Sequence, residues 1–292
     1  MDQQNISRRE FISTMGVGLA AMTIGLAGCA PKEIVKEVPV EITKEVTRIV
    51  PDEKTVEVPQ EIPPSPWEYA ELDIETVRKY GHARYYEGDC CYGAFSAIVE
   101  ALKERVGFPF TQIPTAMMLF GAGGVAGWGT TCGSLIGASA AINLVTEADV
   151  AKKLVDELMN WYSQTPFPSQ ISNEYATQHA FLVKEYKTDK ELPQSVSNSP
   201  LCHVSVSKWC KVSGYASGSK ERSERCGRLT GDVAAKAVEL LNAQYAGAFE
   251  PVFKPSSETQ MCMACHSKGE NYEMGQFTQG KMECTDCHEP HQ

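Results

Sequence analysis

The stretch CMACHSKGENYEMGQFTQGKMECTDCH, from Cys262 to His288, contains the pattern Cys-x-x-Cys-His twice. Two residues between the cysteines let both sulfurs reach the vinyl groups on one edge of a haem, and the adjacent histidine then lies below the iron. A zinc knuckle uses the same residue types, but two complete copies in one short segment favour haem. The sequence therefore predicts two covalently attached haems of the c type.

Each residue of the two patterns has an expected role. The predicted attachment sites are Cys262, Cys265, Cys284 and Cys287. The predicted proximal ligands of the two irons are His266 and His288.

Residues 251–292, which carry both patterns, are too few to enclose two porphyrins alone. The large apolar faces of the haems must therefore pack on each other, on the preceding part of the chain and on a second subunit. Haem binding should in turn order this tail. We expect a homodimer.

Six-coordinate haems would take two more ligands from the remaining histidines. His82, in the segment KYGHARYY, is the first candidate because it lies at a predicted helix end. His179 and His291 are the other distal candidates. His203 adjoins a cysteine and belongs more naturally to a thiolate site. A methionine ligand would raise the haem potential, and the methionines that flank the patterns are Met261, Met263, Met274 and Met282.

Residues 1–29 have the features of an export signal. Residues 7–12 read SRREFI, which fits a twin-arginine signal, and an apolar stretch from Gly16 to Leu26 follows. That stretch is too short to span a bilayer. The sequence LAGC, which ends at Cys29, matches a lipobox, so Cys29 is the predicted lipid-bearing residue. We expect twin-arginine export and a lipid anchor on the periplasmic side of a bacterial membrane.

Residues 30–65 are a predicted stalk, rich in Pro, Val, Lys and Glu. The repeated prolines exclude a long helix and favour an extended spacer. The whole chain has 292 residues and a formal net charge of −10. This acidity argues against nucleic acid as a partner and fits other redox proteins with basic surfaces.

Between residues 66 and 250 the apolar residues recur at helical spacing, which predicts an all-α, irregular helical domain. Asp89 is an expected N-cap, and Thr146 with Asp149 reads as a capping box. The glycine-rich segment Gly121–Gly133 lacks the lysine of a phosphate-binding loop, so its glycines are expected to allow close backbone approach. The expected helices are 73–80, 90–106, 114–120, 132–144, 147–161, 173–186 and 219–245.

Eleven cysteines, less Cys29 and four for haem, leave six in the helical domain: Cys90, Cys91, Cys132, Cys202, Cys210 and Cys226. In an oxidising compartment three disulfides are one interpretation. Adjacent cysteines rarely bond each other, however, and three of the six cluster near Gly- and Ser-rich turns that can surround a small inorganic centre. An iron–sulfur cluster typically takes four thiolates, and zinc would accept the same set.

Several segments resemble a known redox family. CYGAF (Cys91–Phe95), CGSLIGA (Cys132–Ala138) and CGRLTGDVAAKAVELL (Cys226–Leu241) are similar to the C-GCAxxG-C-C family. This core followed by two Cys-x-x-Cys-His patterns resembles the split-Soret cytochromes c over residues 66–292. The chain departs from the family motif Gly-Cys-Ala, since Cys132 lies between Thr131 and Gly133.

The resemblance implies a homodimer with two stacked haems per subunit, an axial ligand donated across subunits and an iron–sulfur centre in the helical domain. A cluster of the 2Fe–2S type is then expected on Cys132, Cys202, Cys210 and Cys226, with Cys90 and Cys91 in reserve.

Three functions are compatible with these features. An electron carrier of anaerobic respiration would use saturated haems and an iron–sulfur centre to connect periplasmic redox partners. A reductase of a small oxidised substrate would need an open iron position. A thiol–disulfide module would use Cys90 and Cys91 with Cys132. We predict an electron carrier rather than an enzyme, with no catalytic residue assigned.

Overall fold

The computed structural model describes residues 61–181 and 186–289, which belong to one unit of the chain, Pro59–Gln292. The predicted export signal, Cys29, residues 30–60 of the predicted stalk and His291 lie outside the described residues. The described part is mostly helical, and within it no strand forms, only two isolated bridges. The helices are α2 (Ile74–Arg105), η1 (Phe110–Gln112), η2 (Thr115–Gly121), α3 (Gly133–Val145), α4 (Ala148–Gln164), α5 (Gln170–Thr177), α6 (Cys202–Ser213), α7 (Lys220–Tyr245) and α8 (Ser257–His266).

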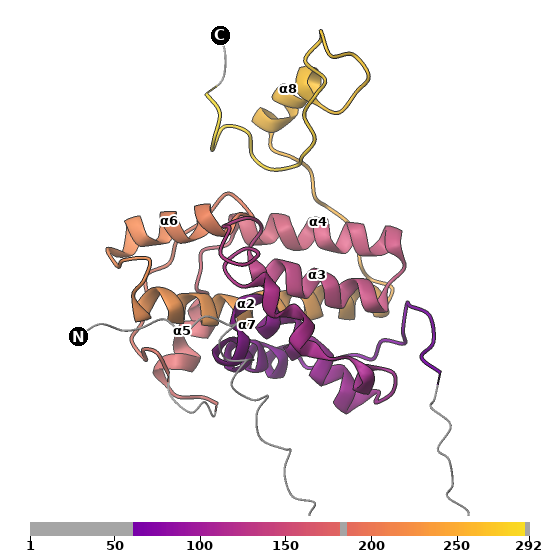
Figure 1. Cartoon of the computed structure of the whole chain (residues 1–292), viewed down its shortest axis with the longest axis vertical. Coiled ribbons are helices and arrows are strands. Elements are labelled where there is room, and N and C mark those ends of the chain that lie inside the picture. Colours follow the sequence, from indigo (N-terminus) through magenta and orange to yellow (C-terminus); the bar gives the residue numbers. More distant parts are fainter. Residues whose placement is uncertain (1–60, 182–185, 290–292) are drawn as a thin grey trace, which may run out of the picture. The chain divides into compact units, whose positions relative to one another are not determined.

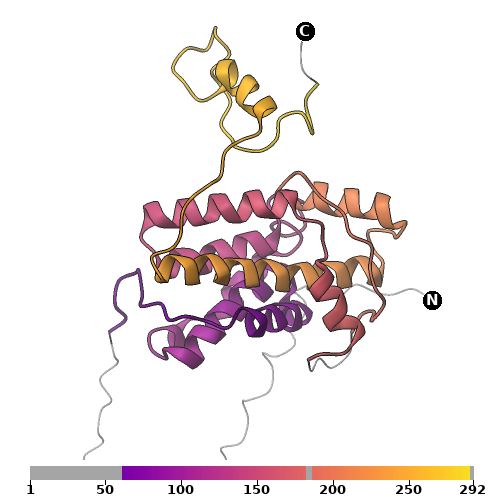
Figure 2. The same cartoon turned by 180° about the vertical axis from the view of Figure 1, so that it is seen from behind.

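Helices α2 and α7 form the most extensive helix pair of the domain and run through its middle (Figures 1 and 2). Two glycines allow their backbones to approach closely. A Cβ on Gly81 of α2 would lie 2.9 Å from the Cα of Gly231 in α7, and a Cβ on Gly231 would overlap the carbonyl oxygen of Arg78. Real side chains do not fit at such distances, so this crossing requires glycine on both helices.

Helices α3 and α4 cover this pair and complete the apolar core. The core side chains recur at helical spacing, which explains why the periodicity predicted these elements. Fully buried core residues include Leu135, Ile142, Leu154, Leu158, Val233 and Val238.

Helix α2 contains the break that the sequence predicted between two separate helices. Gly88 and Asp89 have non-helical dihedrals, with φ of +62° at Asp89, so the axis changes there while the helix continues to Arg105. Gly107 follows the end of the helix with φ of +87°, as expected of a helix-terminating glycine. Cys90 is therefore the first residue after the kink.

Two predicted helix signals are wrong in detail. Thr146 does not form a capping box, because its hydroxyl donates to the carbonyl oxygen of Ile142 and thus bonds the end of α3. Glu147 is the N-cap of α4 and makes no side-chain capping bond. The segment predicted as a helix at 114–120 is the 3-10 helix η2, which fits a run that starts next to a proline.

The helix predicted over residues 173–186 is shorter than expected. Helix α5 ends at Thr177, and His179 follows with φ of +52°. Three helices were not predicted: the short η1, α6 in a segment read as turns, and α8, which contains the first haem pattern. No helix among the described residues is both long enough and apolar enough to cross a lipid bilayer.

A buried ionic network joins α2 to α7. The carboxylate of Glu224 is fully buried and lies 2.9 Å from Nε2 of His82 and 3.1 Å from Nε of Arg228. It also accepts a hydrogen bond from the hydroxyl of Tyr86. Burial alone would raise the pKa of Glu224, but these hydrogen bonds and the charge of Arg228 outweigh burial and lower the pKa from 4.5 to about 2.

Replacing Gly231 by alanine should weaken the α2–α7 crossing. Alanine favours a helix by about 1 kcal/mol, but its methyl group would meet backbone that cannot move aside. We expect the G231A variant to lose about 1–3 kcal/mol of unfolding free energy, measured by urea denaturation followed by far-UV circular dichroism. G218A is the matched control, because a Cβ at Gly218 meets no atom within 4 Å. Equal stability of the two variants would contradict the role of the crossing.

The depressed pKa of Glu224 should make stability depend on pH. Its contribution is fully present above pH 4.5 and is lost as the pH falls through about 2. A shift of this size corresponds to on the order of 3 kcal/mol. We expect the urea midpoints of the wild type and the E224Q variant to differ most above pH 4.5 and to converge towards pH 2. A difference that is independent of pH would show that the carboxylate charge does not matter.

Candidate metal centre

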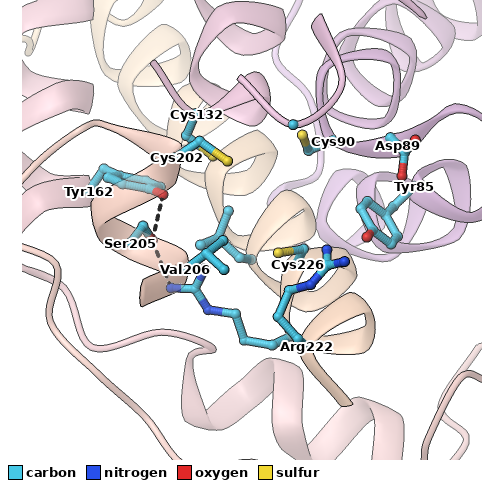
Figure 3. A pocket seen from close by; sticks show the side chains of 13 residues that line it. Tyr85, Asp89, Cys90, Cys132, Tyr162, Cys202, Ser205, Val206, Arg222 and Cys226 are labelled. Carbon is cyan, nitrogen blue, oxygen red and sulfur yellow. Dashed lines mark hydrogen bonds between the residues drawn. The ribbon is translucent and has the colours of Figure 1, made fainter. Parts of the chain in front are cut away.

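Four cysteine side chains from distant parts of the sequence meet at one small cavity (Figure 3). They are Cys90, Cys132, Cys202 and Cys226. The cavity has a volume of about 60 Å³. Organic ligands usually occupy pockets of roughly 300 Å³ or more, so this space suits a small inorganic group.

Three of these cysteines lie where a helical segment begins. Cys90 follows the kink of α2, Cys132 is the N-cap of α3, and Cys202 is the first residue of α6. The N-terminal end of a helix carries a partial positive charge, which stabilises a nearby thiolate. Cys226 approaches from the side of α7, near its beginning. Thiolate ligands are therefore favoured by the local backbone.

A backbone bridge holds Cys132 beside Cys202. Thr131 and Leu201 pair in an isolated bridge. The amide of Cys132 donates to the carbonyl of Pro200 (2.8 Å), and the amide of Cys202 donates to the carbonyl of Thr130 (2.7 Å). These bonds place the starts of α3 and α6 next to each other, although seventy positions separate the two cysteines in the sequence.

The glycine-rich segment makes the close approach that the sequence predicted. Gly124 has φ of +70°, and a Cβ there would lie 2.9 Å from Cβ of Cys202. A Cβ on Gly133 would overlap Sγ of Cys90. Glycine at 133, where the family motif has alanine, thus gives room for the Cys90 thiol.

The cavity thiols differ in their acidity. A hydrogen bond from the Cys90 thiol, with further bonds from Ser134 and Tyr162, lowers the pKa of Cys132 from 9.0 to about 6 despite burial. The same hydrogen bond raises the pKa of Cys90 well above its ordinary value. Burial raises the pKa of Cys202 to about 12. A bound metal cation would displace the remaining protons, because thiolates are the ligands.

The structure brings together three of the four cysteines that the sequence predicted as cluster ligands. Cys132, Cys202 and Cys226 line the cavity, and Cys90, held in reserve, completes the four. Cys210 does not line it, because the segment is helical and places Cys210 about 12 Å along α6 from Cys202. Cys91 is fully buried in the core beside Gly121.

The four thiols line the cavity without forming a single-ion site. Over residues 61–181 and 186–289, no three Cys, His, Asp or Glu side chains are close enough to hold one metal ion. The cavity thiols instead surround a space, as the thiolates of an iron–sulfur cluster do. His203, which the sequence associated with this site, is exposed and does not line the cavity.

The first haem pattern lies on the short helix α8. Cys262 and Cys265 are three residues apart on this helix and so share a face. His266 ends the helix, and its Nδ1 lies 3.3 Å from the carbonyl oxygen of Gly275. Such a bond orients a metal-binding imidazole.

The second haem pattern forms a tight turn. The amides of Cys287 and His288 both lie within hydrogen-bonding distance of the carbonyl oxygen of Cys284, at 3.2 and 2.9 Å. The tail buries little of its own surface: within residues 251–289, Thr259 is the one buried residue. The haems would therefore need cover from outside the tail.

The candidate distal histidines have different surroundings. His82 is 2% exposed, and its Nε2 is bonded within the Glu224 network, so iron ligation would require that nitrogen to leave Glu224. His179 is exposed and its Nε2 lies 3.3 Å from Asp189. His291 lies outside the described residues.

Comparisons with known proteins identify the family of the chain. The family model described as "Putative redox-active protein (C_GCAxxG_C_C)" matches residues 92–240. The split-Soret cytochrome c of Desulfovibrio desulfuricans (strain ATCC 27774 / DSM 6949 / MB) is 37% identical over 227 residues, which cover 76% of this chain and 77% of that protein.

A solved structure of the split-Soret cytochrome c from Desulfovibrio desulfuricans ATCC 27774, described as containing a novel iron centre, is similar in fold. It aligns with a TM-score of 0.66 and 35% identity over 76% of this chain and 90% of the other. The resemblance noted in the sequence is thereby confirmed: the chain belongs to the split-Soret cytochrome c family and contains its C_GCAxxG_C_C domain.

Proposed function

We propose that this protein is an extracytoplasmic electron carrier with two covalent haems c and one iron–sulfur centre of the 2Fe–2S type. The observation that carries the proposal is the convergence of four thiols on one cavity in a chain that also has two haem-attachment patterns. When bound, such cofactors accept and release single electrons, and the protein sets their potentials through ligands, burial and charge.

The proposed cluster ligands are Cys90, Cys132, Cys202 and Cys226. Hydrogen bonds from Cys90, Ser134 and Tyr162 lower the pKa of Cys132, which favours its thiolate form as a ligand. The enclosing helices exclude bulk water, since Cys90 and Cys132 are both buried. An iron centre is described for the related solved structure, which supports its presence here.

A thiol–disulfide function is the second candidate. The hydrogen bond between Cys90 and Cys132, with one pKa lowered, is the arrangement that activates a thiolate for exchange. Both thiols are buried, however, and a protein disulfide partner would not reach them. Iron analysis, below, separates the two candidates.

A homodimer is also part of the proposal. Large apolar side chains are exposed on the helical domain, where Trp128 is 83% exposed, and along the haem tail. The exposed apolar residues of the two regions include Met117, Leu119, Phe120, Trp128, Val252, Met261, Tyr272, Met274, Phe277 and Met282. A second subunit would cover such surfaces and could supply a distal histidine. Sedimentation of the haem-loaded protein tests this, and a monomer would contradict it.

We further propose twin-arginine export and a lipid anchor at Cys29, which places the protein on the periplasmic side of a bacterial membrane. Covalent attachment of haem c agrees with an extracytoplasmic location. The C29A variant would then appear in the soluble periplasmic fraction, with both haems retained. An unchanged membrane association would exclude the anchor.

Serine substitution should identify the cluster ligands. We expect each of C90S, C132S, C202S and C226S to lose the iron in excess of haem, together with acid-labile sulfide, because the cluster loses one of four thiolates. Elemental analysis and colorimetric sulfide assays measure this. C210S is the matched control, since Cys210 does not line the cavity. If C210S lost this iron and sulfide while C90S kept them, the ligand set predicted from the sequence would be correct instead.

Removing one haem pattern should remove one haem. The C262A/C265A double variant should carry only the haem at the second pattern, and C284A/C287A only the haem at the first. The pyridine haemochrome assay and the mass of the intact protein report the number bound. A wild-type chain whose mass includes no haem would refute the proposal.

A further inference from the structure

Two arginine side chains reach the thiol cavity from α7. Arg222 and Arg225 are three residues apart, so they share a face of the helix, and both line the cavity together with Cys226. Both guanidinium groups lie close enough to Cys226 to interact with its sulfur. Arg225 is 1% exposed, whereas Arg222 is partly exposed at the cavity edge.

Arg225 has a donor without an acceptor. Its Nη2 donates to Oγ of Ser205 (2.9 Å), which also accepts from the hydroxyl of Tyr162 (2.9 Å). Nε of Arg225 is buried and makes no hydrogen bond with the described residues. A buried donor left unsatisfied costs about 1–3 kcal/mol. A group that fills the cavity and offers sulfur or another acceptor would relieve this cost.

The charges around the cavity are unbalanced without an anion. One other charged side chain lines it, the exposed carboxylate of Asp89, while two guanidinium groups and the starts of three helical segments contribute positive potential. A fully buried guanidinium is normally paired with an acidic group, as Arg228 is with Glu224. No described carboxylate forms an ion pair with Arg225 or Arg222. Thiolates are the available counter-charge.

We propose that Arg222 and Arg225 balance the negative charge of the thiolate ligands of the iron centre and thereby raise its reduction potential. A nearby positive charge stabilises the more negative, reduced state relative to the oxidised state. Because both residues lie beside Cys226, their effect is local to the centre. The inference rests on the proposed function, since it assumes that the cavity holds iron.

The test compares single charge removals on the same helix. R222Q and R225Q each remove one positive charge at the cavity, and K220Q removes one from the exposed start of α7, outside the cavity lining. The full-length, haem-loaded protein is titrated with reductant. Electron paramagnetic resonance follows the iron–sulfur signal, and visible absorption follows the haems in the same sample.

We expect R222Q and R225Q each to lower the equilibrium constant for reduction of the centre at least tenfold, a fall of about 59 mV for a one-electron couple. The reduction potentials of the two haems should stay unchanged in these variants. K220Q should shift the reduction potential of the centre less than R222Q or R225Q does. R225K keeps the charge, so it should shift the potential less than R225Q does.

Each outcome decides between the claims. A loaded centre with an unchanged potential in R222Q and R225Q, or an equal shift in K220Q, would overturn the inference and leave the proposed function intact. If R225Q does not fold, R222Q decides alone, because Arg222 is partly exposed and less involved in packing. A wild-type protein with no iron beyond haem and no sulfide would instead overturn the proposed function.

Discussion

The contact between Gly81 and Gly231 is the constraint on which the rest of the domain depends. It brings the backbones of α2 and α7 closer than any side chain at these positions would permit. Cys90 follows the kink of α2 and Cys226 lies near the start of α7, so the same crossing sets how these two thiols face each other. The Glu224 network then links the two helices, because the buried carboxylate of Glu224 on α7 binds His82 on α2 as well as Arg228.

The cavity combines five sources of positive potential, three helix starts and two arginines, with four thiols. Helix starts lie behind Cys90, Cys132 and Cys202, and two arginines approach from α7. Each source alone has a modest effect, since a helix terminus stabilises a nearby negative charge by about 0.3–1 kcal/mol at an exposed site. In the low-dielectric interior, all of these electrostatic interactions are stronger. The fold therefore gives the cavity a positive potential that favours thiolate over thiol.

Much of this architecture could be predicted from the sequence. The periodicity located α3, α4 and α7, and the kink falls where Asp89 was expected to begin a helix. Three of the four cavity thiols were also expected. Cys210 was expected in place of Cys90 because α6 was read as turns, and its serines and lysines give only a weak apolar stripe.

Other features depend on tertiary contacts that local patterns do not encode. Apart from Tyr86 on the same helix, the partners of His82 come from α7 and from the chain around Phe181 and Tyr186, so the local sequence did not predict its burial. The pairing of Thr131 with Leu201 is equally non-local. One signal for Cys90 was present: Gly133 replaces the alanine of the family motif, which leaves space for a neighbouring sulfur.

The order of the cysteines along the chain has a consequence for biogenesis. The cavity thiols extend from Cys90 to Cys226, so they meet only after nearly the whole helical domain has folded. The haem cysteines come later in the chain, and two of them, Cys265 and Cys287, remain exposed in the folded structure. Folding therefore encloses the cavity thiols, whereas these two haem-attachment cysteines stay accessible to chemistry after the helical domain has folded.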